Sequence, residues 1–365
     1  MRTRSTIVVV VAAVAAAVAG GCKKKQPAER YDRVAVAALA AIPADASVVV
    51  GMDVAQLAQA AVVVRAVDQM LVRDPELAAR LARLATDCGV DVARQIKTVH
   101  LALGPRAPGK GSAVPPSLLV ATGQLSEPAL TRCLQAGTGS GGGELSVRDV
   151  GGRPLYKLTE GARVLHLAFG QDDTVVIGAD EGWVLAAVGS GAKVTTSKEL
   201  GPLLAQVDRS AALWAVAVMD AELGQALSRV TGGKVGASPR ALHGALDTRS
   251  GLAGTVAFAM ATEGDAEALV GFARDEIQLL ALAAQTLGLG RVVAKVRVER
   301  KGSEAQFRVA LTDDEVRQVL SAIDRGQVSG QDAQPFNADA VDASIAAPGG
   351  DASTDAFVDA PRDAP

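Results

Sequence analysis

The chain has 365 residues, which is enough for two domains or one large one, and 49% of them are hydrophobic, which permits a sizeable core. Its 37 lysines and arginines are nearly balanced by 40 aspartates and glutamates, so the formal net charge is only −3. This balance excludes the strongly basic surface that nucleic-acid binding requires, and we expect no nucleic acid among the partners.

The N-terminus has the pattern of an export signal. Arg2 and Arg4 are followed by an uncharged apolar run over residues 7–19. That run is too short to cross a hydrocarbon core of about 30 Å as a helix, which takes about 20 residues. A short positive segment followed by a short apolar run is typical of a signal peptide, and we assign residues 1–21 to one.

Cys22 follows the small residues Ala19, Gly20 and Gly21 and precedes a run of lysines. This arrangement resembles the lipobox of bacterial lipoproteins, although the leucine usual three residues before the cysteine is Ala19 here. The resemblance implies that the Cys22 thiol carries a lipid, that residues 22–41 form a lipidated tether, and that the membrane is a partner. The alternative is an ordinary secretory signal in which Cys22 is incidental.

The residue after Cys22 bears on the location of the protein. In lipoproteins an aspartate at this position holds the protein in the inner membrane, whereas this chain has Lys23. The resemblance therefore favours the outer membrane over the inner one, with the body facing the periplasm or the cell surface. The lysines at positions 23–25 add attraction to anionic lipid headgroups, about 1 kcal/mol for each.

Two further cysteines, Cys88 and Cys133, lie in the body of the chain. In an oxidising envelope they are candidates for a disulfide. The alternative is that each is a small buried hydrophobic residue. Neither has a second cysteine at the short spacing of a redox or zinc motif, so we expect neither role.

Residues 42–196 are predicted to form a first α+β half. A strand ends near Asp53, whose carboxylate can accept the free amide protons at the start of a helix. Pro75 and Gly89 mark the first position and the stop of the next helix. The remaining elements are, in order, strands over 98–104 and 117–123, a helix capped at Ser126, hairpins over 144–158 and 163–180, and a helix over 181–189.

Residues 197–326 are predicted to repeat this order as a second α+β half. Met219-Asp220 follows a strand as Met52-Asp53 does, a strand-to-helix step spans 251–288, and a hairpin over 292–311 leads to a helix capped near Thr312. We interpret this as an internal duplication with the order β-α-(α)-β-α-β-β-α in each half. The expected fold class is α+β, with two similar halves whose mostly antiparallel sheets are packed by helices.

The opening stretch PADASVVVGMD at residues 43–53, with its duplicated strand-helix unit, resembles a family of uncharacterised bacterial envelope proteins. The resemblance extends over residues 42–323 and implies no catalytic residues. If the two halves are equivalent, we expect a shared groove at their junction near residues 193–204.

Two segments are predicted to lack regular structure. Residues 327–365 are rich in Asp, Ala and Pro and cannot bury enough apolar surface to offset chain entropy, so we expect a disordered tail. The glycine-rich stretch over 136–143 is expected to be a flexible connection.

Three short stretches match catalytic or nucleotide-binding motifs only in part. Residues 104–112 read G-x-x-x-x-G-K, but Gly111 stands where a phosphate loop has Ser or Thr, and no helix follows. Residues 137–142 read G-x-G-x-x-G, but between a helix and a strand, which is the reverse of a dinucleotide site. Residues 190–193 read S-x-x-K without its companion motifs. We therefore predict no cofactor.

The histidines also give no sign of a catalytic or metal site. We expect His100 and His166 in strands and His243 in a loop or at a helix end, each without a metal-ligand neighbour at short spacing. Asp172 and Asp173 are interpreted as a turn between strands. The sequence thus predicts no catalytic and no metal-binding residues.

These observations favour a non-enzymatic, lipid-anchored envelope protein with a protein-interaction or structural role and an unknown envelope protein as its partner. One alternative is a carrier or sensor of an apolar small ligand in the periplasm, which requires an apolar pocket of several hundred Å³. A second alternative is an unrecognised hydrolase.

Overall fold

The structure is a computed structural model that describes residues 38–89, 91–105, 115–141, 143–170, 174–219 and 239–329. The signal peptide, Cys22, residues 220–238 and residues 330–365 lie outside this set, so the predictions made for them stay predictions. Residues 321–365 form a unit separate from residues 1–320, of which the structure describes only 321–329 at the end of the last helix.

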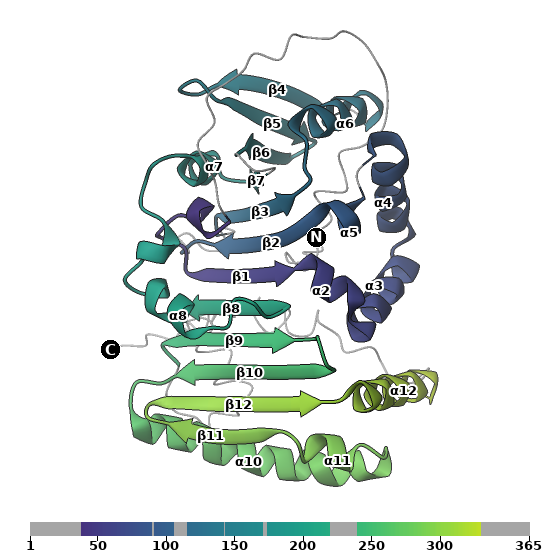
Figure 1. Cartoon of the computed structure of the whole chain (residues 1–365), viewed down its shortest axis with the longest axis vertical. Coiled ribbons are helices and arrows are strands. Elements are labelled where there is room, and N and C mark those ends of the chain that lie inside the picture. Colours follow the sequence, from purple (N-terminus) through teal and green to yellow (C-terminus); the bar gives the residue numbers. More distant parts are fainter. Residues whose placement is uncertain are drawn as a thin grey trace, which may run out of the picture. The chain divides into compact units, whose positions relative to one another are not determined.

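A single 12-stranded antiparallel sheet forms the framework of the body (Figure 1). Its order is β11-β12-β10-β9-β8-β1-β2-β3-β7-β6-β5-β4. The strands are β1 Val48–Asp53, β2 Ile96–Leu103, β3 Ser117–Gly123, β4 Glu144–Asp149, β5 Pro154–Glu160, β6 Arg163–Phe169, β7 Thr174–Gly178, β8 Leu213–Val218, β9 Ala241–Asp247, β10 Leu252–Ala259, β11 Arg297–Lys301 and β12 Glu304–Leu311.

Helices connect the strands and cover the sheet. They are α2 Val54–Gln59, α3 Ala61–Arg73, α4 Pro75–Cys88, α5 Val92–Gln95, α6 Glu127–Gly141, α7 Glu181–Val188, α8 Leu200–Gln206, α10 Glu263–Thr286, α11 Gly290–Val293 and α12 Asp313–Ser329, with short 3₁₀ turns η1 Leu39–Ala41 and η2 Val194–Thr196. The mixture of helices with one large antiparallel sheet confirms the predicted α+β class.

The order of elements repeats about the centre of the sheet. Outward from β1 the order is β1-β2-β3-β7-β6, and outward from β8 it is β8-β9-β10-β12-β11. A helix follows the third strand of each series, α6 after β3 or α10 after β10, and another follows the fourth, α7 after β7 or α12 after β12. The hairpin β4–β5 is an addition to the first half. The two similar halves are therefore present, but they share one continuous sheet through the β1–β8 pair.

Local sequence signals account for several element ends. The Asp53 carboxylate accepts a hydrogen bond from the Gln56 amide at 2.9 Å and caps α2, as predicted. Gly89 follows the helix that starts at Pro75 and has φ of +64°, a conformation that glycine adopts without strain. Thr312 and Glu315 bond each other's backbone amides at the start of α12 and form a capping box, so the helix is capped at Thr312 as predicted.

The two faces of the sheet are covered differently. The face that we call the α7 face carries the larger core, in which strand residues such as Val120, Val176 and Trp214 pack under α7 and α8. On the opposite face α6 covers the first half, where Leu130 packs on Leu119 and its neighbours. There α10 covers the second half through a cluster that includes Leu269, Val270, Val298, Phe258 and Phe307.

Two predictions of local structure were wrong. His243 lies in a strand, β9, which the expected order of the second half omitted. The glycine-rich stretch after Cys133 continues α6 as far as Gly141 and is not a flexible connection up to that residue.

Candidate functional site

An open groove of about 1200 Å³ lies on the α7 face of the second half. Small residues on β9, β10 and β12 form much of its floor, namely Ala245, Ala253, Thr255 and Ala310. One side is built by residues 206–208 at the end of α8, and the other by β11 with Ala294 and Lys295 before it. The groove therefore spans strands of the second half and is bordered by α8, the helix that lies over the join of the two halves.

The groove exists because the helix after β12 does not return over the sheet. In the first half α7 follows β7 and packs on β6 and β7. Its counterpart α12 packs instead through Val316 and Val319 beside Val292 and Leu311. Among the residues that the structure describes, no helix therefore covers the α7 face of the second half as α7 covers that of the first.

Equivalent positions on this face differ in chemistry between the halves. Val176 lies four residues before Asp180, the cap of α7, and is fully buried between Val120 and Ala168 on the neighbouring strands. The equivalent residue of the second half is Arg308, which lies four residues before Thr312 at the start of α12. Arg308 pairs with Thr255 and Arg297 on the neighbouring strands. A packed apolar layer in one half therefore corresponds to an open polar surface in the other.

A continuous set of polar contacts crosses this surface. His243 Nε2 lies 3.4 Å from Glu304 Oε1, and the Gln306 amide donates to Glu304 Oε2 at 2.8 Å. Arg308 Nη2 donates to Gln306 Oε1 at 2.8 Å, and Arg308 Nη1 lies 2.9 Å from Glu299 Oε1. Because Gln306 is only 6% exposed and bonds on both sides, it fixes the positions of Glu304 and Arg308.

Two aspartates form the acidic end of the groove. Asp208 accepts hydrogen bonds from the hydroxyl and the amide of Ser210, and these bonds lower the pKa of Asp208. The Arg249 side chain donates to Asp247 at 2.8 Å and, with the Arg249 amide, lowers the pKa of Asp247 to about 2. Both side chains are therefore carboxylates at neutral pH.

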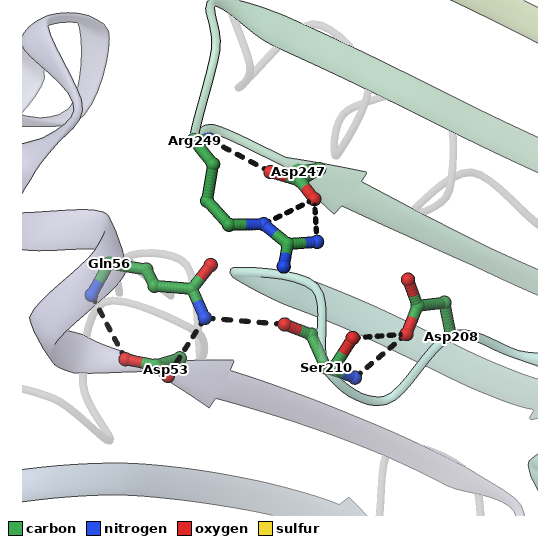
Figure 2. A network of polar contacts seen from close by, with 6 residues as sticks. All are labelled: Asp53, Gln56, Asp208, Ser210, Asp247 and Arg249. Carbon is green, nitrogen blue, oxygen red and sulfur yellow. Dashed lines mark hydrogen bonds and ion pairs between the residues drawn. The ribbon is translucent and has the colours of Figure 1, made fainter.

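Contacts between the two halves hold this acidic end in place, as Figure 2 shows. The Gln56 side-chain amide donates to Asp53 Oδ2 at 3.0 Å and to the Ser210 carbonyl at 3.2 Å. Asp53 ends β1 and Gln56 lies on α2, whereas Ser210 precedes β8. The loop that carries Asp208 is thus tied to the first half.

The opposite side of the groove is basic. Lys295, Arg297, Lys301 and Arg308 all line it. The Lys295 ammonium donates to Glu315 on α12 at 2.6 Å, and this bond lowers the pKa of Glu315. The groove therefore presents carboxylates along one side and cationic side chains along the other.

The described residues offer neither a metal site nor a membrane span. Over the ranges that the structure covers, no group of three His, Cys, Asp or Glu side chains could hold a metal ion. Over the same ranges, no helix combines the length and apolar character needed to cross a bilayer.

The predicted disulfide between Cys88 and Cys133 stays a prediction, because only one of the two side chains is described. Cys133 is disulfide-bonded and lies buried on α6 near Leu77 of α4. Cys88 is the last residue of α4, but its side chain lies outside the described set. The packing of α4 on α6 is compatible with the Cys88–Cys133 pair, which stays a prediction.

Two of the three histidines are core residues of the first half. His100 on β2 is 8% exposed, its ring lies 5.6 Å from that of Trp214, and burial lowers its pKa to about 4. His166 on β6 lies 3.7 Å from Glu181, and burial lowers its pKa as well. The third, His243, lines the groove, a position that no sequence pattern indicated.

The described residues of the three incomplete motifs do not line the groove. Residues 106–114 and 171–173, which include Lys110 and Asp172, lie outside the described residues. Lys193 donates to the carbonyls of Ala186 and Ala187 and so caps the end of α7. The junction over 193–204 is filled by side chains such as the buried Leu200 and Leu204, and the groove begins just after it, at Gln206.

Comparisons with known proteins add little to this description. No protein-family model matches the chain, and no curated protein matches it. Among solved structures, crystal forms III and I of a protein called TP0453 are similar, with TM-scores of 0.44 and 0.41 and sequence identities of 8% and 10%. These matches cover 79% and 80% of this chain and 99% of that chain. At TM-scores as low as these, the likeness supports no conclusion about function.

Proposed function

We propose that the protein is a lipid-anchored component of the bacterial cell envelope that acts by binding another envelope component in the groove of its second half. The observation that carries this proposal is the open polar surface around Arg308, at positions where the first half is packed and apolar. The lipobox-like sequence at Cys22 supports the anchor.

The contacts within the groove favour binding over catalysis. His243 faces Glu304, Asp247 is bonded to Arg249, and Arg308 is held by Gln306 and Glu299. Side chains that fix one another in this way present a rigid pattern of charges to a ligand. We therefore propose a non-enzymatic role.

The pattern of cavities favours a polar ligand over an apolar one. The apolar pocket between α7 and β5–β6, which Leu155, Phe169 and Leu185 help to line, measures about 170 Å³. Sites for small ligands commonly measure 300–1,000 Å³. The groove is larger and carries charged side chains along both of its sides, so we rank the carrier of an apolar ligand second.

A protein partner is supported by a separate surface. Leu279, Leu280 and Leu282 near the end of α10 are 61%, 59% and 64% exposed. Clustered apolar side chains at a surface are typical of interaction sites. We propose that this surface contributes to contacts in the envelope, with the outer membrane as the favoured location.

The anchor is tested by cell fractionation of the Cys22→Ser variant. We expect the wild-type protein in the membrane fraction and the variant in the soluble envelope fraction or in unprocessed form. A variant that is processed normally and still fractionates fully with membranes would show that Cys22 is not the anchor.

The groove is tested by purifying the tagged full-length protein from its own cells with and without Thr255→Trp. Thr255 lies in the floor, so the indole should obstruct the groove and reduce co-purification of the bound component at least about tenfold. The matched control is Ser146→Trp on β4, an exposed strand position outside the groove. Equal co-purification with Thr255→Trp and Ser146→Trp would contradict the proposal.

A further inference from the structure

Two arginines stand opposite each other at the basic side of the groove. Arg297 on β11 and Arg308 on β12 are direct partners in the antiparallel pair, and both line the groove. Directly opposed residues have Cβ atoms about 4.5–5.5 Å apart, and like charges at this separation destabilise a sheet. The pair therefore costs stability unless an anion lies between the two guanidinium groups.

The sheet itself does not require arginine at either position. The equivalent residues of the first half are Ala168 and Val176, which are 4% and 0% exposed under α7. Arg297 is exposed and, among the residues that the structure describes, forms no hydrogen bond or ion pair. Its guanidinium group is thus available to a ligand.

The other arginine is already oriented toward the groove. Arg308 is held by Gln306, and its pair with Glu299 joins side chains that are 50% and 51% exposed. An ion pair this exposed is weak and can be exchanged for a ligand anion, whereas the bond to the buried Gln306 can remain. Lys295 lies on the same side, where its ammonium is paired with Glu315.

We propose that Arg297 and Arg308 form a binding site for a phosphate group carried by the ligand of the groove. The proposal rests on the proposed function and specifies the chemistry of its ligand. Planar guanidinium groups bind phosphate oxygens through paired hydrogen bonds, and two of them match the double charge of a phosphate monoester better than the single charge of a carboxylate. The phosphate could belong to a lipid headgroup or to a soluble ester.

The test measures phosphate binding by the full-length Cys22→Ser chain in which Lys23, Lys24 and Lys25 are also replaced by Gln, so that neither a lipid nor these lysines bind membranes. One arm titrates inorganic pyrophosphate by calorimetry, and the other measures co-sedimentation with phosphatidylcholine vesicles with and without phosphatidic acid. The variants are Arg297→Gln, Arg308→Gln and the double variant. The matched control is Arg300→Gln, which removes the same charge from β11 on the opposite face, where Arg300 pairs with Glu263 and Glu267.

We expect binding in at least one arm, weakened at least about tenfold in the double variant and unchanged in Arg300→Gln, because hydrogen bonds between charged groups are the stronger ones. Pyrophosphate binding would show that a soluble phosphate group is a sufficient ligand, and binding to phosphatidic acid vesicles alone would identify a lipid headgroup. Melting temperatures that match wild type exclude misfolding as the cause.

Absence of binding in both arms, or binding that the double variant leaves intact, would overturn the phosphate site. Neither result would overturn the proposed function, because co-purification that depends on Thr255 tests the groove without reference to the ligand's charge. If Thr255→Trp did not reduce co-purification of the bound component, the proposed function would be overturned instead.

Discussion

Gly51 on β1 and Trp214 on β8 lie directly opposite each other where the two halves join. The indole occupies the space next to the Gly51 backbone, so a Cβ built on Gly51 would lie 2.2 Å from Trp214 Cε2. Trp214 is only 4% exposed and also contacts the ring of His100. The packing of β1 against β8 therefore depends on glycine at position 51 and on the large indole of Trp214 opposite it.

Gly51→Ala should destabilise the protein strongly. The added methyl group cannot be accommodated without moving a buried indole, and such overpacking costs up to about 3 kcal/mol or occasionally more. Chemical denaturation followed by tryptophan fluorescence measures the change. Gly191→Ala is the matched control, because a Cβ at Gly191 meets no atom within 4 Å. Similar unfolding midpoints for the two variants would show that the close approach of Gly51 and Trp214 is unimportant.

Asp53→Ala should destabilise by about 1 kcal/mol, the usual cost of losing a helix N-cap. The variant also frees the Gln56 side chain, which links α2 to the Ser210 carbonyl. Asp68→Ala, an exposed position on α3, controls for the loss of one negative charge. If Asp53→Ala and Asp68→Ala unfold at the same denaturant concentration, the cap contributes nothing.

Stability should fall as the pH drops from 6.5 toward 4 because of His100. The folded chain protonates His100 only near pH 4, whereas the unfolded chain does so below its ordinary pKa of 6.5. Protons are therefore taken up on unfolding across this window, and the difference amounts to roughly 3 kcal/mol. His100→Gln, which cannot titrate, should reduce the pH dependence of the unfolding free energy. Identical pH profiles of variant and wild type would exclude His100 as the cause.

The two body cysteines should be bonded to each other. Peptide mapping without reduction should recover the segments containing Cys88 and Cys133 as one linked species. Closing a loop of about 45 residues stabilises by roughly 4 kcal/mol in the chain-entropy model, so Cys88→Ser and Cys133→Ser should lower stability to a similar extent. A map that links Cys133 to another residue would refute the pairing.

Much of the fold follows from local signals in the sequence. Asp53, Pro75, Gly89 and Thr312 each mark a helix end that the structure confirms. The repeated order of strands and helices predicts two similar halves. That these halves share one sheet was not predictable, because the pairing of β1 with β8 joins residues far apart in the chain and has no local signature.

The failure to predict strand β9 has a physical explanation. Its sequence, Ala241–Asp247, contains small residues and lacks the β-branched pattern by which strands are recognised. Gly244 is required there because a Cβ would lie 2.7 Å from the Thr255 carbonyl oxygen. The strand therefore forms through its neighbours β8 and β10 and not through its own propensity.

The groove could not be predicted for a related reason. In the sequence, Arg297 and Arg308 resemble ordinary surface charges in strands whose residues alternate between the two faces. Only the pairing of β11 with β12 places them opposite each other. The departure of α12 from the sheet, which leaves them uncovered, depends on tertiary packing around Val316. This surface differs from an ordinary solvated face because the equivalent positions of the first half are buried and apolar.

Site-specific photo-crosslinking in living cells tests the central claim most directly. A photoreactive residue is placed at Thr255 in the floor of the groove, and the same residue at Ser146 on β4 serves as the control. We predict a discrete crosslinked product in the membrane fraction from position 255 and none from position 146, with the product lost when Arg297 and Arg308 are both replaced by Gln. Equal crosslinking from both positions, or none from position 255 in correctly anchored protein, would contradict the account of the groove as the binding site.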